Sequence, residues 1–208
     1  LAFGATARLT SEVEHEDAVR LVTAGTLTEG QPYVVLAPYP GETVAELVAR
    51  RPGRVPPGEA LRIVHDVLAV LEVAHAAGVV HGALGPDQLV ITDCGAMKIL
   101  GFGAGPLLVE ASRALAIAPS PTLAAFTPPE LGEDPSARPS VATDLWGVGA
   151  VLFYLLTGEL PRASEEGGGP LLGEPRAPAA LEALVSRGLA RAPAARFPSA
   201  ATFRSAVA

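Results

Sequence analysis

The stretch from residue 56 to residue 100 constrains the fold of this chain more than any other part. Its start, Pro56-Pro57-Gly58-Glu59, is typical of the first turn of a helix. Apolar residues then recur at steps of three and four positions: Leu61, Val64, Leu68 and Leu71. This spacing predicts a long amphipathic helix that ends near Gly78, since glycine commonly terminates helices. A β-hairpin is predicted next, with strands at 89–91 and 97–100 around a turn at 92–95.

The remaining segments predict further helices and strands. The most apolar run, 144–157, predicts a buried helix that Gly158 ends. Residues 33–36 read as a buried strand because they are rich in β-branched residues. Further helices are predicted at 3–13, 42–50, 179–189 and 199–207, an extended run at 18–22, and irregular chain at 104–127 and 159–178.

The composition predicts a globular, acidic chain of one domain, or of one large lobe with part of another. Of its 208 residues 49% are hydrophobic, and the formal net charge is −7. This charge argues against nucleic-acid binding, which draws its affinity from clustered Lys and Arg. The one basic cluster, Arg50, Arg51 and Arg54, is interpreted as a solvated helix end. The apolar run 147–157 is shorter than the roughly 20 residues that span a bilayer, so we expect no membrane span.

The single cysteine and the first residue bear on where the protein acts. Cys94 has no internal partner for a disulfide, which favours a reducing compartment, and we expect a cytoplasmic location. No signal peptide is visible. The chain begins with Leu1 and its only methionine is Met97, so we expect a fragment or processed form of a longer product.

Five short motifs occur in order: HGALGPDQLV at 81–90, MKILGFG at 97–103, PPE at 128–130, TDLWGVG at 143–149 and LARAPAAR at 189–196. Together they resemble motifs of the protein kinase family, which has H-R-D-L-K-P-x-N, D-F-G and A-P-E at the first three places. The resemblance covers nearly the whole chain. It implies an α+β, protein-kinase-like fold, mainly the α-helical large lobe with a reduced or truncated small lobe. We expect 1–40 to be the remnant of the small lobe and hinge, and 41–208 the large lobe.

Within this resemblance, the positions that handle ATP have lost their chemistry. Ala83 replaces the catalytic aspartate, and a methyl group cannot accept a proton. Gly101 replaces the metal-binding aspartate of D-F-G, and Gln88 replaces an asparagine with a side chain one methylene longer. Gly85 and Gly82 replace a lysine and an arginine that contact phosphate groups in the family. The degenerate positions are His81, Gly82, Ala83, Gly85, Gln88, Gly101, Phe102 and Gly103; no catalytic residue and no metal ligand is predicted.

Positions with a structural role in the family are retained. The resemblance implies that Asp144 holds the backbone of the catalytic loop, that Glu130 pairs with Arg196, and that His81 packs rather than acts as a base. The only lysine, Lys98, lies on the predicted hairpin, so the phosphate-gripping lysine of the family has no counterpart. In the family, the phosphate-gripping lysine pairs with a glutamate, and the position of this glutamate would fall near Thr6.

The leading hypothesis is a catalytically inactive protein-kinase-like domain, a pseudokinase, that acts as a regulatory or protein-interaction module. We expect neither ATP nor magnesium as a cofactor and no nucleic-acid partner. Protein partners are expected, such as an active kinase or a phosphopeptide-binding domain. Such a domain could recognise phosphorylated residues of the segment that resembles the activation segment: Ser112, Ser120 and Thr122.

Two alternatives stay open at this point. The domain could bind nucleotide without transferring phosphate, with backbone groups of Ala37 to Tyr39 contacting adenine and Val90 beneath the base. It could also be an enzyme with rebuilt chemistry, for which Asp87 and Asp93 are the nearest carboxylates. The four histidines show no metal-ligand spacing. Thermal-shift measurements with ATP, with and without magnesium, discriminate the first alternative from the leading hypothesis.

Overall fold

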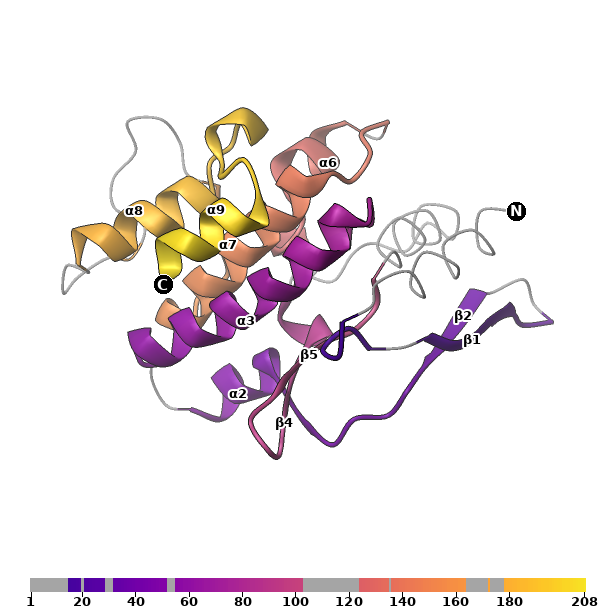
Figure 1. The fold of residues 1–208 in the computed structure, drawn as a ribbon. Coiled ribbons are helices and arrows are strands. Elements are labelled where there is room, and N and C mark those ends of the chain that lie inside the picture. The colour runs from indigo at the N-terminus through magenta and orange to yellow at the C-terminus, as the bar shows by residue number, and fades with distance from the viewer. Residues whose placement is uncertain are drawn as a thin grey trace.

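The computed structural model describes residues 15–19, 21–28, 32–51, 55–102, 124–134, 136–163, 172 and 178–208. Most of this part is a helical body, and one pair of strands stands apart from it (Figure 1). The strands are β1 (Leu21–Thr26), β2 (Pro32–Leu36), β3 (Gly41–Thr43), β4 (Leu89–Thr92) and β5 (Met97–Ile99). The helices are α2 (Val44–Arg50), α3 (Pro57–Ala76), α6 (Pro129–Glu133), α7 (Val141–Thr157), α8 (Ala179–Gly188) and α9 (Ala200–Val207), with single 3-10 turns at Pro86–Gln88 and Pro193–Ala195.

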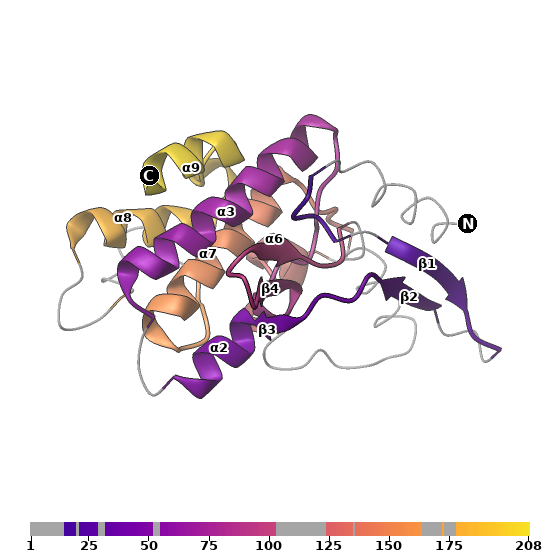
Figure 2. The ribbon, with the colours of Figure 1, turned by 60° about the horizontal axis from the view of Figure 1, so that its bottom comes forward.

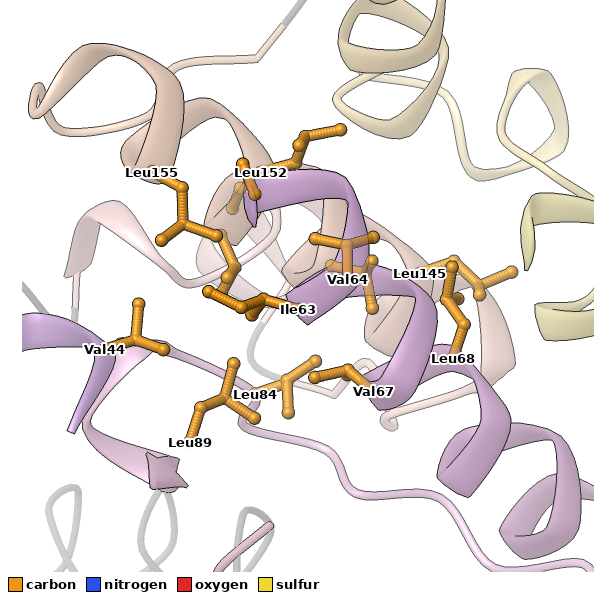
Figure 3. Packing of buried hydrophobic residues seen from close by; sticks show 14 of the residues in the cluster. Val44, Ile63, Val64, Val67, Leu68, Leu84, Leu89, Leu145, Leu152 and Leu155 are labelled. Carbon is orange, nitrogen blue, oxygen red and sulfur yellow. The ribbon is translucent and has the colours of Figure 1, made fainter. Parts of the chain in front are cut away.

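The core of the body lies between the two long helices α3 and α7. In Figure 3, Ile63 and Val64 of α3 point into the same cluster as Leu152 and Leu155 of α7. Leu84, which lies in the loop between α3 and β4, also belongs to this cluster. Burying each of these side chains stabilises the fold by about 1.5–3 kcal/mol. The loop after α3 is therefore anchored on the core of the molecule rather than on its surface.

Helix α7 begins at Val141, three residues before the predicted start at 144. Ser140 precedes it with an extended backbone, and its amide donates to the Thr143 hydroxyl at 3.0 Å. This reciprocal cap pairs amides that the first turn of a helix leaves free. At the other end, Gly158 has φ of 73°, as the prediction of a glycine stop requires.

Two small antiparallel sheets carry the strands. β1 pairs with β2, and β3, β4 and β5 form a second sheet in that order. The predicted hairpin at 89–100 is confirmed as β4 and β5, with Gly95 at φ of 81° in its turn. The strand β3 was not predicted, because it has only three residues and two of them, Gly41 and Glu42, are of types depleted in strands. It forms through its pairing with β4, for example Thr43 opposite Val90.

Residues 15–19 join the second sheet without belonging to a named strand. Ala18 forms an isolated parallel bridge with Ile99, and the Val19 amide donates to the Ile99 carbonyl at 2.9 Å. The predicted extended run at 18–22 is thus divided, since β1 starts only at Leu21. Likewise α2 starts at Val44 rather than at 42, because Thr43 caps it through the Glu46 amide. The predicted helix at 3–13 and most of the irregular runs lie outside the described residues.

Candidate functional site

The candidate site is the loop 81–88, which lies between α3 and β4. Asp144 of α7 holds the start of this loop. The two carboxylate oxygens of Asp144 accept hydrogen bonds from the backbone amides of His81 and Gly82, each at 2.8 Å. Asp144 is buried, and its Oδ2 also lies 2.8 Å from Nε2 of His75 on α3. Charge-assisted bonds of this kind are about twice as strong as neutral ones, so one carboxylate fixes the start of the loop.

His75 is a partner of Asp144 that sequence reasoning missed, since this histidine was considered only for metal-ligand spacing. The two residues are 69 positions apart, so no local pattern links them. The only available signal was that His75 lies on the apolar face of α3, where a polar side chain needs a partner.

His81 is placed as a buried structural residue. Its Nε2 lies 2.9 Å from the Leu100 carbonyl, so this nitrogen carries the proton, and Nδ1 accepts from the Ala83 amide at 3.3 Å. The ring meets Phe102 edge-on, with 5.0 Å between centroids. Burial lowers the pKa of His81, although the Asp144 charge and the Leu100 carbonyl oppose this shift. Neutral His81 thus links the loop to the end of β5.

Gly82 and Gly101 both lie in the left-handed region of backbone conformation, with φ of 82° and 80°. A residue with a side chain would be strained at these positions, by roughly 1–2 kcal/mol. Glycine lets the loop and the turn after β5 keep these conformations without that strain. Asparagine and aspartate tolerate the region better than other side chains, so an aspartate at 101 would fit the backbone.

Gly85 is buried and has two side chains close to it. A Cβ atom built on Gly85 would lie 3.1 Å from Oε1 of Gln88 and 3.6 Å from the side chain of Phe126. The amide end of Gln88 therefore lies beside Gly85, and a small shift of this flexible side chain would make room for a Cβ atom. Ala83 is half-buried and presents only a methyl group. The structure brings Ala83, Gly85 and Gln88 together in one loop.

Two of the positions that handle magnesium and phosphate in the family have no side-chain oxygen in this chain. Magnesium requires hard oxygen ligands, and neither Ala83 nor Gly101 has a side-chain oxygen. The carboxylate of Asp144 is committed to backbone amides. Asp87 is exposed at the loop surface. Within the described residues there is no group of three or more His, Cys, Asp or Glu side chains arranged for a metal.

Lys98 is engaged away from the loop 81–88. Its Nζ donates to Oδ1 of Asp17 and to the carbonyl of Glu16, both at 2.8 Å, and lies 5.6 Å from the centroid of the Tyr39 ring. The only lysine of the chain thus has an anionic, a carbonyl and an aromatic neighbour.

The residues predicted as nucleotide contacts lie near the junction of the two sheets. Ala37 and Tyr39 belong to the segment that joins β2 to β3, and the side chain of Tyr39 is exposed. Val90 is buried in β4, between Thr43 and Lys98 in the sheet register. A nucleotide contact at these residues stays a prediction.

The pair of Glu130 and Arg196 lies by the first turn of α7, where Arg196 contacts the Ala142 carbonyl. The guanidinium donates to both carboxylate oxygens of Glu130 at 2.7 Å. It also donates to three backbone carbonyls, those of Ala142, Ala190 and Arg191. The pair therefore connects α6, the start of α7 and the segment after α8.

The other predicted residues are placed as follows. Arg50 and Arg51 each form a two-point ion pair, with Glu42 and Glu59, so their charges are already compensated. Cys94 is exposed in the turn between β4 and β5. Residues outside the described part of the chain are Thr6, Arg54, Gly103, Ser112, Ser120 and Thr122.

The fold and the site together define a kinase-like domain, with a helical lobe that holds a loop between its long helix and a hairpin. A protein kinase domain matches residues 6–171, and the chain belongs to the protein kinase family. No helix of the described part is long and apolar enough to cross a membrane.

Several bacterial proteins are similar to this chain. It is 32% identical over 201 residues to the serine/threonine-protein kinase PknK of Mycobacterium tuberculosis, covering 90% of this chain and 18% of that protein. It is 31% identical to PksC of Streptomyces coelicolor, covering 83% and 34%. The crystal structure of the PknI kinase domain of M. tuberculosis superposes with a TM-score of 0.77 at 25% identity, covering 98% of this chain and 76% of that one. The chain thus spans about a fifth to a third of these curated relatives.

Proposed function

We propose that this domain is a catalytically inactive kinase, a pseudokinase, whose role is regulatory and depends on binding another protein. The observation that carries the proposal is the contrast between two sets of positions. Asp144 still bonds the backbone at the start of the loop 81–88, and Glu130 still pairs with Arg196. Ala83 and Gly101, in the same structure, offer no side-chain oxygen to a substrate hydroxyl or a metal ion.

The expected size of the loss in phosphoryl-transfer rate supports the proposed inactivity. Phosphoryl transfer depends on positioning and on charge stabilisation, and one well-placed cation is worth roughly 10³ to 10⁵ in rate. Loss of both the proton acceptor and a metal ligand would leave turnover near background, even though such effects are not additive.

The relatives named above are called serine/threonine kinases, so an active kinase is the alternative that the test must address. The assay measures transfer from radiolabelled ATP with magnesium to a generic protein substrate, using the full-length protein. We expect the rate of the natural sequence to equal that of an Ala83→Asn variant and of a reaction without protein. A higher rate for the natural sequence would contradict the proposal.

Two further variants sharpen the result. Asp87→Asn and Asp93→Asn test rebuilt chemistry, because a turnover that one of them abolishes would assign the carboxylate to catalysis. The triple reversion Ala83→Asp, Gln88→Asn and Gly101→Asp tests whether the scaffold is still competent. Activity in the reversion alone would support the view that the site, and not the lobe, has been lost.

The regulatory part of the proposal has its own test. The initial rate of an active serine/threonine kinase from the same cells is measured with and without the purified domain. We expect a change in that rate that persists in the Ala83→Asn variant, since the proposed role needs no chemistry at residue 83. No change for any active kinase of those cells would contradict a regulatory role toward kinases.

A further inference from the structure

Lys98 occupies a junction between two parts of the chain. It lies on β5, an outer strand of the three-stranded sheet, opposite Val90 of the middle strand β4. Its ammonium group contacts Asp17 and Glu16 on one segment and the ring of Tyr39 on another. These two segments are separated in sequence by the whole β1–β2 pair.

The β1–β2 pair is attached to the rest of the described structure through these same segments. The chain enters the pair from 15–19 and leaves it through 37–40, which leads into β3. Both connections meet one end of the pair, where Leu21 lies opposite Leu36. Figures 1 and 2 show the pair standing away from the helices, so these connections decide how it is oriented.

The two connections are not held equally by the backbone. The first is bonded to β5, through Val19 N to Ile99 O at 2.9 Å and Ile99 N to Asp17 O at 2.8 Å. Residues 37–40 form no strand and precede the pairing of Gly41 with Thr92. The second connection, 37–40, has no regular backbone pairing. The contact of Lys98 with Tyr39 therefore gives this connection a side-chain link.

The burial of the ion pair makes it stronger than the usual surface pair. The side chains of Lys98 and Asp17 are 14% and 22% exposed, whereas those of Arg62 and Asp66 on α3 are 53% and 35% exposed. Shielding from water reduces screening, and the short 2.8 Å contacts are charge-assisted. A positive charge near an aromatic ring adds a further attraction.

We propose that Lys98 is a clasp that draws the two connections together and fixes the orientation of the β1–β2 pair on the large lobe. Asp17 and the Glu16 carbonyl hold one side of the ammonium group, and Tyr39 holds the other. The strand pair then moves with the large lobe instead of pivoting about residues 37–40. This inference does not depend on the proposed loss of catalysis, because it concerns only the contacts of Lys98.

Hydrogen exchange measured by mass spectrometry tests the clasp in the natural sequence, in Lys98→Met and in the control Arg62→Met, which removes an exposed charge. We expect Lys98→Met to speed exchange about tenfold or more in peptides covering 15–28 and 32–40, as the loss of charge-assisted bonds allows local opening. Peptides of 141–157 should be unchanged. The control should match the natural sequence everywhere.

Two results would overturn the clasp. One is equal exchange in Lys98→Met and Arg62→Met at 15–28 and 32–40. The other is a rise of the same size in 141–157, which would mean that Lys98 stabilises the whole fold. If Lys98→Met fails to fold, Asp17→Asn removes the anionic side alone and should speed exchange in the same peptides. The double variant Asp17→Asn/Lys98→Met should exceed Lys98→Met by less than twofold, and fully additive effects would refute the pairing.

Discussion

Removal of the Glu130 carboxylate tests how the large lobe is held together. The side chain of Arg196 is fully buried, and both of its terminal nitrogens donate hydrogen bonds to Glu130. The side chain of Glu130 is 22% exposed. Removing one partner of a buried pair costs about 3–5 kcal/mol, because the other charge is left without compensation. Since Glu130 is partly exposed and Arg196 keeps three carbonyl acceptors, we expect Glu130→Ala to cost about 3 kcal/mol, the lower end of that range.

The matched control is Glu133→Ala, three residues along the same helix. Glu133 pairs with Arg191, and these side chains are 59% and 54% exposed, so its loss should cost less than about 1 kcal/mol. Urea denaturation followed by circular dichroism gives both free energies of unfolding, and Glu130→Ala should also lower Tm by about 6–12 °C. Equal losses in the two variants would refute the assignment of Glu130 and Arg196 as a structural pair.

Three further predictions concern the loop and the helix packing. Asp144→Asn should lower the free energy of unfolding by about 3 kcal/mol in urea denaturation, because an amide has one acceptor oxygen where two backbone amides need one each; an unchanged midpoint would contradict the role of the carboxylate. The lowered folded-state pKa of His81 means that the unfolded chain binds the proton more readily, so its stabilising contribution is complete above about pH 6.5 and is lost as the pH falls toward the folded-state pKa. Unfolding between pH 7.5 and 5.5 should therefore show a steeper loss of stability in the natural sequence than in His81→Phe; parallel pH profiles would exclude His81 as the cause. Gly149→Ala should cost about 1–3 kcal/mol, since its Cβ would lie 2.8 Å from the backbone of Gly188 on α8, whereas Gly132→Ala, with nothing within 4 Å, should leave Tm unchanged or slightly raised.

The parts of the fold that the sequence predicted are those with a strong local pattern. The period of apolar residues in α3 and the turn glycine of the β4–β5 hairpin depend on neighbours within a few positions, so both elements could be predicted. β3 could not be, because its three residues become a strand only by pairing with β4. The start of α7 was placed too late, since the Ser140–Thr143 cap is polar and resembles a loop in sequence.

The contacts of the candidate site also divide into those that a motif indicated and those that no local pattern could indicate. The family resemblance indicated the contacts of Asp144 and of Glu130 with Arg196, because the motifs that contain them are recognisable one by one. The contact of His75 with Asp144 and the contacts of Lys98 with its three neighbours join residues that are 59 to 82 positions apart. The approach of the Gln88 amide to Gly85 also escaped prediction, because the sequence does not show in which direction the Gln88 side chain points.

The attachment of the loop 81–88 to Asp144 has a consequence for any protein that recognises this face. The loop takes its shape from a carboxylate rooted in the core helix and from a leucine, Leu84, packed beneath it. Both supports belong to the folded core of the lobe. Under the proposed loss of nucleotide binding, a partner of this loop would therefore meet a surface that does not change with the ATP concentration, and its response would be set by how much of the two proteins is present.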